Sequence, residues 1–112
     1  MNYLGLDYGN EHVGVAIATT PLAEPLTTLS TKRSLQLIKD LIKKHSIDEV
    51  VIGDCPSDYL KGIDIPVHIV DETLTSHDAR EYLLHTTQSK RRSLEHAVSA
   101  ALILQSYLDS PQ

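Results

Sequence analysis

The sequence predicts an α/β fold built on a mixed sheet, and three patterns carry this prediction. Large and small apolar residues alternate over residues 12–18, which is typical of a strand with one face packed closely by another element. The apolar spacing then becomes helical over residues 35–42. Short continuous apolar runs at residues 50–52 and 67–70 are typical of buried parallel strands.

The first third of the chain predicts a meander of three strands. Pro21 and Pro25 bracket the turn before the third strand, and Asp7 ends the first. The expected strands are residues 3–6, 12–18 and 26–29.

Helices alternate with strands in the remainder. The helical spacing predicts a helix over residues 34–45, with Ser34 as its N-cap. Thr75 followed by Asp78 resembles a capping box that starts a second helix. A long last helix is marked by apolar residues from Leu94 to Leu108, and they are numerous enough for burial on more than one side.

This element order predicts a five-stranded sheet with the strand order 3-2-1-4-5, helix 34–45 on one face and the last helix on the other. The connection at residues 54–65 is close to the minimum for a parallel crossover, so it holds at most a turn or two of helix. We expect this shortened connection to leave apolar sheet surface less covered than in longer relatives, and a homodimer or a protein partner to lie at this edge.

Bulk composition limits the class of protein. The length of 112 residues predicts one domain over residues 1–112. No apolar run approaches the length of a membrane span, and the strand-like N-terminus is unlike a signal peptide. Cys55 is the one cysteine, so it has no partner for an internal disulfide, and beside Pro56 we interpret it as inert. These features predict a cytoplasmic protein.

The net charge of −5 argues against a protein that merely coats nucleic acid, because non-specific binding is mostly phosphate neutralisation. The basic residues are nevertheless clustered. Two clusters, at residues 32–33 and 43–44, are interpreted as solvated surface. The third, Lys90-Arg91-Arg92, lies immediately before the expected last helix and is the candidate contact for nucleic acid.

Acidic side chains mark the ends of two expected strands, where ligands gather in α/β sheets. Asp7 ends the first strand and Glu72 follows the fifth, while Glu95 and His96 lie near the start of the last helix. Carboxylates at adjacent strand ends repel one another unless a cation lies between them, and Mg²⁺ and Mn²⁺ accept such oxygen ligands. Alternatively, Asp7 is an ordinary turn residue and His96 an ordinary surface residue.

Three motifs in this order resemble the YqgF (RuvX) family of Holliday-junction resolvases and pre-16S rRNA nucleases. They are Asp7-Tyr8-Gly9 with Gly14-Val15-Ala16, the segment Asp71-Glu72-Thr73-Leu74-Thr75-Ser76, and the helix Ala100 to Leu108. The resemblance implies an RNase H-like fold, a divalent metal site (Mg²⁺ or Mn²⁺) and a structured nucleic-acid substrate.

The resemblance also assigns roles. Asp7 and Glu72 would be metal ligands and catalytic, and His96 stands where the family has its third acidic position, with Glu95 next to it. Glu11-His12 occupies the place of a Lys-Arg pair, and Thr73 that of an Arg. Asp71 is interpreted as a structural partner.

Three functions therefore remain open. The first is a metal-dependent nuclease, weakened by these substitutions, that acts on pre-16S rRNA or on Holliday-junction-like DNA. The second is a non-catalytic RNase H-like domain that binds nucleic acid or a protein. The third is an actin-like phosphotransferase, suggested by Asp7-x-Gly9 before a strand hairpin, although that fold needs two such domains to enclose a nucleotide.

Overall fold

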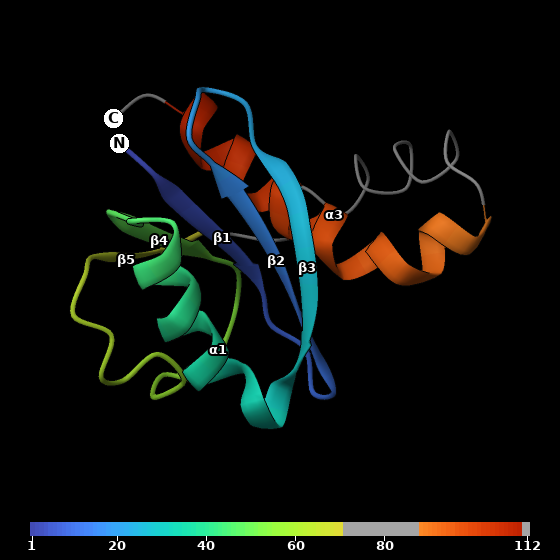
Figure 1. Ribbon diagram of the computed structural model, residues 1–112, viewed down its shortest axis with the longest axis horizontal. Helices are drawn as coiled ribbons and strands as arrows, with labels where there is room; N and C mark the ends of the chain where they lie inside the picture. The colour runs from blue at the N-terminus through green and yellow to red at the C-terminus, as the bar shows by residue number, and fades with distance from the viewer. Residues whose placement is uncertain (71–87, 111–112) are drawn as a thin grey trace.

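The computed structural model describes residues 1–70 and 88–110, with side chains from Glu95 onward in the second range. It contains a five-stranded sheet with the order β3-β2-β1-β4-β5, which confirms the predicted topology (Figure 1). β1 pairs antiparallel with β2 and parallel with β4, and β5 is parallel to β4. The elements are β1 (Tyr3–Asp7), β2 (His12–Ala18), β3 (Glu24–Ser30), α1 (Thr31–Lys44), β4 (Glu49–Ile52), β5 (Val67–Ile69) and α3 (Gln88–Asp109).

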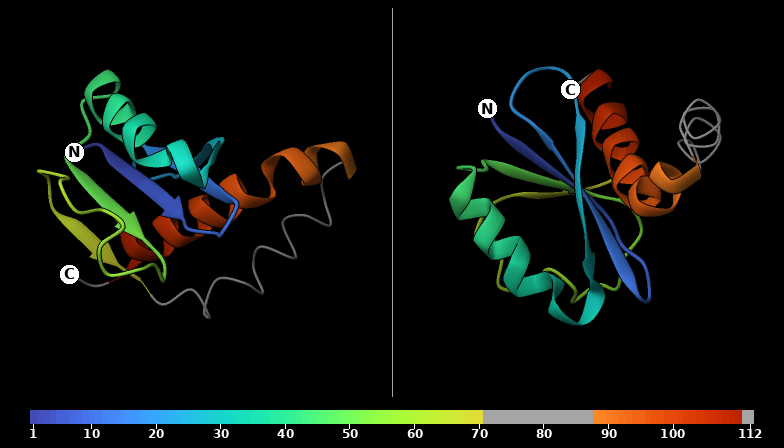
Figure 2. Two further views of the ribbon diagram at one scale, coloured as in Figure 1. Left: turned by 90° about the horizontal axis from the view of Figure 1, so that it is seen from below. Right: turned by 45° about the vertical axis from the view of Figure 1, so that its right-hand side comes forward.

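The two described helices cover opposite faces of the sheet, as predicted (Figure 2). The face toward α1 is lined by large aliphatic side chains, among them Leu4, Leu6, Val13 and Val15, which pack with Ile38 of the helix. The face toward α3 carries small residues on β2, Ala16 and Ala18, together with Val51 of β4. The strand register explains the division, because residues directly opposite one another on neighbouring strands point to the same face.

β3 is longer than expected and contains Pro25, which the sequence predicts to lie in the preceding turn. β3 is an edge strand, so a residue without an N–H can be accommodated there. The pairing of β2 with β3 also shifts register between Val15 and Ala16, and Ala16 is the residue that pairs with Pro25. β5, in contrast, ends at Ile69, one residue before the predicted end, although the Val70 amide still donates to the Ile52 carbonyl at 2.8 Å.

The prediction that Ser34 caps α1 is wrong. Ser30 is the N-cap and makes no side-chain capping hydrogen bond. Instead Thr31 anchors the helix start to the β1–β2 turn, since its amide donates to the Glu11 carbonyl and its hydroxyl to the Gly9 carbonyl. Ser34 lies within the first turn, fully buried, and its hydroxyl donates to the Thr31 carbonyl at 2.8 Å.

The connection between β4 and β5 contains turns and no helix over residues 53–66, as its length predicted. The expectation that sheet surface is less covered than in longer relatives stays a prediction, although the connection does cover part of the α1 side of the sheet. Its apolar side chains fold back on the α1 side of the core, where Tyr59 accompanies Leu60, Ile63 and Ile65. Tyr59 also shares a hydrogen bond with the buried Ser34 hydroxyl. Cys55 is partly buried against the same core.

α3 begins earlier than predicted, so Lys90-Arg91-Arg92 lies within it rather than before it. The buried side chains of its described part include Ala97, Val98, Ala101 and Leu104, which agrees with the predicted apolar surface. The predicted helix that starts at Thr75 lies outside the described residues. Neither of the two described helices has the length and apolar composition that a membrane span requires.

Candidate active site at the carboxyl end of β1

Asp7 is the last residue of β1 and lies on the α3 side of the sheet. It is directly opposite Gly14 of β2 in the antiparallel register. Its side chain is mostly buried, with 17% of its surface exposed. A carboxylate in this position faces the helix across a neighbour that has no side chain.

Gly14 allows α3 to approach the sheet closely. A Cβ atom built on Gly14 would lie 1.8 Å from the His96 carbonyl oxygen, closer than non-bonded atoms can come. Gly5 has a related role further along the helix, where a Cβ would lie 2.7 Å from that of Leu104. Small residues at alternate positions of β1 and β2 therefore determine how near His96 comes to Asp7.

His96 is the α3 residue that faces Asp7. Its Nδ1 lies 4.0 Å from Asp7 Oδ2, and its side chain is 41% exposed. Glu95, the sequence-based alternative, is exposed. Adjacent helix positions point about 100° apart, so only one of the two can face the carboxylate.

His12 is a part of the site that sequence reasoning missed. Its ring stacks on that of His96, with centroids 5.7 Å apart and planes at 25°. The sequence places His12 only at a basic position of the family pattern, and His12 shows no metal-ligand spacing to another histidine, so its contact with His96 was not predicted. The available signal was the strand period: His12 and Gly14 are two residues apart on β2 and therefore on the same face.

The Asp7–His96 pair fits a divalent cation. A separation of 4.0 Å is too long for a hydrogen bond. Two ligand atoms about 2.1 Å from one ion lie roughly 3.0 Å apart at an octahedral angle and about 3.4 Å apart at a tetrahedral one, so the gap would narrow by about 0.6–1 Å on binding. Carboxylate oxygen and imidazole nitrogen are both common ligands of divalent metals.

The other predicted site residues are not placed by the structure. Glu72 lies outside the described residues, as do the side chains of Lys90, Arg91 and Arg92. Among residues 1–70 and 95–110, no group of three His, Cys, Asp or Glu side chains is close enough to hold a metal. The described part of the site thus supplies two candidate ligands, Asp7 and His96.

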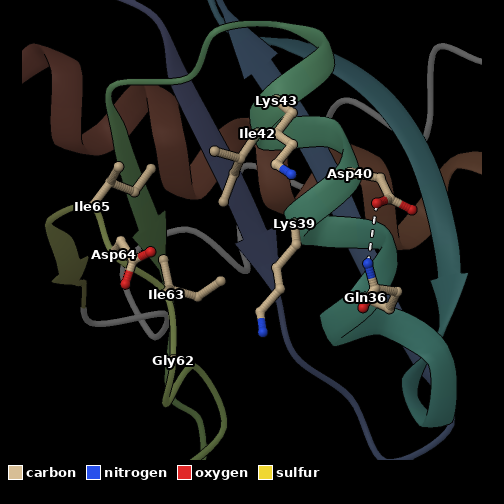
Figure 3. A pocket seen from close by; sticks show the side chains of 9 residues that line it. All are labelled: Gln36, Lys39, Asp40, Ile42, Lys43, Gly62, Ile63, Asp64 and Ile65. Atoms are coloured by element: carbon tan, nitrogen blue, oxygen red, sulfur yellow. Dashed lines mark hydrogen bonds between the residues drawn. The ribbon is translucent and has the colours of Figure 1, made fainter.

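A hollow lies away from Asp7, between α1 and the β4–β5 connection (Figure 3). It is an open groove of about 310 Å³. Ile42, Ile63 and Ile65 form its apolar part, and the Lys39 and Lys43 side chains border it. The groove has no residue in common with the Asp7 site, whose described part is an exposed surface at a strand end.

A second polar cluster lies on the α3 face at the opposite end of the strands. His68 Nε2 and Glu49 Oε1 are 2.8 Å apart, and the His68 ring stacks on Tyr107 at 4.9 Å. Burial, followed by the nearby Glu49 carboxylate, raises the pKa of Tyr3. These contacts join β4, β5 and α3, and we assign them a structural role.

Solved structures identify the class of fold. The Thermus thermophilus RuvC structure in complex with a Holliday junction substrate matches with a TM-score of 0.63 at 14% identity, covering 96% of this chain and 93% of that one. The fowlpox virus Holliday junction resolvase matches with a TM-score of 0.62 at 10% identity, covering 99% and 100%. The chain therefore has the RNase H-like fold of RuvC-type resolvases.

The chain belongs to the RuvX family, described as Holliday junction resolvase, whose model matches residues 1–59 and 56–110. Two similar relatives are both named "putative pre-16S rRNA nuclease". The one from Caldanaerobacter subterraneus is 32% identical, covering 98% of this chain and 97% of its own length. The one from Syntrophus aciditrophicus is 34% identical, covering 98% and 89%.

The alignments also locate where this chain is shorter. The alignment with the Caldanaerobacter relative spans 136 positions, more than the 112 residues of this chain, so the relative carries residues that this chain lacks. The two segments matched by the family model meet at residues 56–59, within the β4–β5 connection. Both observations agree with the shortened connection that the sequence predicted.

Proposed function

We propose that the chain is a divalent-metal-dependent nuclease, a single RNase H-like domain over residues 1–112 that cleaves structured nucleic acid. The observation that carries the proposal is the Asp7 carboxylate at the end of β1, facing the His96 imidazole across Gly14. The family description and the names of the relatives suggest the substrate: a pre-16S rRNA or a Holliday-junction-like DNA. We expect the protein to act in the cytoplasm.

In this proposal Asp7, Glu72 and His96 hold Mg²⁺ or Mn²⁺ and are the catalytic residues. The ion would activate a water molecule and neutralise charge on the scissile phosphate. Asp7 supplies negative charge from a mostly buried position, where it retains a cation more firmly than an exposed carboxylate does. His96 would supply a second ligand, from α3, to an ion held by Asp7.

The test is the substitution Asp7→Asn, which keeps the shape of the side chain and removes its charge. We expect cleavage of four-way DNA junctions and structured RNA with Mn²⁺ to fall by about 10²–10⁴-fold, a typical range for one catalytic group. Calorimetry should also show loss of Mn²⁺ binding. The matched control is Asp64→Asn, which neutralises an exposed acid in the groove away from Asp7. A wild-type protein that cuts neither substrate and binds no Mn²⁺ at millimolar concentration would contradict the proposal.

Lys90, Arg91 and Arg92 are proposed to contact substrate phosphates, and salt dependence tests them. Each phosphate contact removed should reduce the slope of log affinity against log salt by roughly 0.7–0.9. We therefore expect a shallower slope when the three residues are replaced by alanine. The same triple substitution at Lys39, Lys43 and Lys44 of α1 is the control. Equal slopes in wild type and the 90–92 variant would remove this surface from the proposal.

A non-catalytic domain that binds nucleic acid is the second candidate. The observation that favours it is His12, which occupies the place of a basic residue in the family pattern and stacks on His96. If this function is correct, the protein binds RNA or junction DNA in a salt-dependent way and releases no cleavage products. The substitution Asp7→Asn then leaves this binding unchanged.

A homodimer is the remaining part of the proposal. Its support is the edge strand β5, where the Ile69 side chain is 69% exposed. We expect a dimer mass in light scattering at high concentration, and a shift toward the monomer in Ile69→Lys. A monomer at all concentrations would contradict it.

A further inference from the structure

The donor set of the Asp7 site is mixed, and this has a consequence for the choice of ion. Asp7 contributes carboxylate oxygen, whereas the atom of His96 that faces it is an imidazole nitrogen, Nδ1. Mg²⁺ takes oxygen ligands in nearly ideal octahedral geometry and loses its water reluctantly. Imidazole binds transition-series ions and zinc much more readily.

Three features of the structure keep this nitrogen donor at the site. The His96 carbonyl lies directly over Gly14, so the backbone of α3 has no room to approach further. The neighbouring Ala97 and Val98 are buried, which fixes the rotation of the helix. His12 stacks on the His96 ring and limits where that ring can turn. An ion bound by Asp7 therefore meets an imidazole at a position that an additional water would otherwise fill.

We infer that this site selects Mn²⁺, Co²⁺ or Zn²⁺ over Mg²⁺, with His96 Nδ1 as the nitrogen ligand that confers the selectivity. The inference rests on the proposed function only for the location of the metal site. It concerns which ion binds and leaves open what the bound ion then does.

Calorimetry with Mn²⁺ and Mg²⁺ on wild type and His96→Asp tests the inference. We expect wild type to bind Mn²⁺ about 100-fold more tightly than Mg²⁺, and His96→Asp to reduce this ratio at least about tenfold, mainly through tighter Mg²⁺ binding, since oxygen replaces nitrogen. His45→Asp is the matched control, because it makes the same change at the end of α1, and it should leave the ratio unaltered. An unchanged ratio in His96→Asp would overturn the inference.

A second measurement needs no variant. Long-range ¹H–¹⁵N NMR of the wild-type imidazoles during a Zn²⁺ titration distinguishes Nδ1 from Nε2 in each ring. We expect the His96 Nδ1 resonance to shift on binding and that of His68 to stay in place. If only other histidines respond, His96 is not the ligand and the inference fails, whether or not His96→Asp folds.

The two proposals fail in different ways. Selective binding with a shifted Nδ1 and no cleavage by any ion contradicts the nuclease and leaves the inference standing. Cleavage that is equally fast with Mg²⁺ and Mn²⁺, together with equal affinities, leaves the nuclease standing and overturns the inference.

Discussion

The two faces of the sheet are built from the same strands and have opposite designs. Toward α1, the three central strands β1, β2 and β4 present large aliphatic side chains, such as Leu6, Val15 and Ile52. Toward α3, β1 and β2 present small residues where the helix crosses them, among them Gly5, Gly14 and Ala16, while β4 presents Val51. The first face obtains stability from buried apolar area. The second loses side-chain area but lets a helix backbone come close enough to place His96 next to Asp7.

Alternation along a strand can therefore separate stability from site geometry. A change on the α1 face should alter the free energy of unfolding and leave the site intact. A change on the α3 face should displace the site itself, even where the substituted residue has no chemical role. The following predictions test this separation, from the largest expected effect to the smallest.

Gly14→Ala should have the largest effect. The added methyl group would lie 1.8 Å from the His96 carbonyl, which is backbone and cannot turn away, so α3 must shift. We expect unfolding in urea to become easier by more than about 3 kcal/mol, above the usual range for an overpacked core. The ¹⁵N resonances of His96 should also move. Gly62→Ala is the comparison: strain at φ 95° costs about 1–2 kcal/mol, and the atom nearest to the added Cβ is the flexible end of the Lys39 side chain, 3.7 Å away. Similar costs for the two would contradict the close-approach argument.

Ile38→Ala tests the opposite face. Ile38 of α1 is fully buried among the large side chains, so its truncation leaves a cavity. We expect a loss of about 3 kcal/mol in the free energy of unfolding, with Mn²⁺ affinity unchanged in the folded protein. Leu37→Ala, at a neighbouring position that is 37% exposed, should cost less than about 1 kcal/mol. A weakened metal site in Ile38→Ala would show that the two faces are not independent.

The Ser34–Tyr59 hydrogen bond should contribute a smaller amount on the α1 face. The single Ser34 proton goes to the Thr31 carbonyl, so the Tyr59 hydroxyl donates to Ser34 and fastens the shortened connection to α1. Tyr59→Phe should cost about 1 kcal/mol in urea unfolding, and Ser34→Ala a similar amount. Their costs should not add in the double variant, because each removes the same bond. Ser57→Ala, an exposed serine of the same connection, should be neutral.

Alkaline pH should produce the smallest and most specific effect. Burial raises the pKa of Tyr59 above the ordinary tyrosine value of about 10. A raised pKa means that the folded state favours the neutral phenol. The stability that this supplies is fully present below the ordinary pKa and is lost as the pH rises through the folded-state value. Tyr59→Phe should flatten the fall in melting temperature above pH 10, and the remaining slope includes Tyr3, whose pKa is also raised. An unchanged slope would mean that Tyr59 has the same pKa in the folded and the unfolded protein.

The amino-acid sequence alone determined the strands and their order. Period-two alternation in residues 12–18 and the short apolar runs at 50–52 and 67–70 depend on local spacing, which survives without knowledge of the fold. The end of β1 at Asp7 and the short connection after β4 were predictable for the same reason. The motifs in chain order also indicated the family.

Only the tertiary structure decided the contacts between elements. Ser34 looks like a helix cap in the sequence, but β3 runs directly into α1 and Thr31 is held by the β1–β2 turn, so Ser34 is carried inside the helix and buried. Pro25 lies within a strand because β3 is at the sheet edge. His12 joins the site because Gly14 admits α3, which brings the His96 ring onto it. Local spacing records which way a residue points, whereas the neighbour it meets depends on how closely two elements pack, and that is a property of the folded chain.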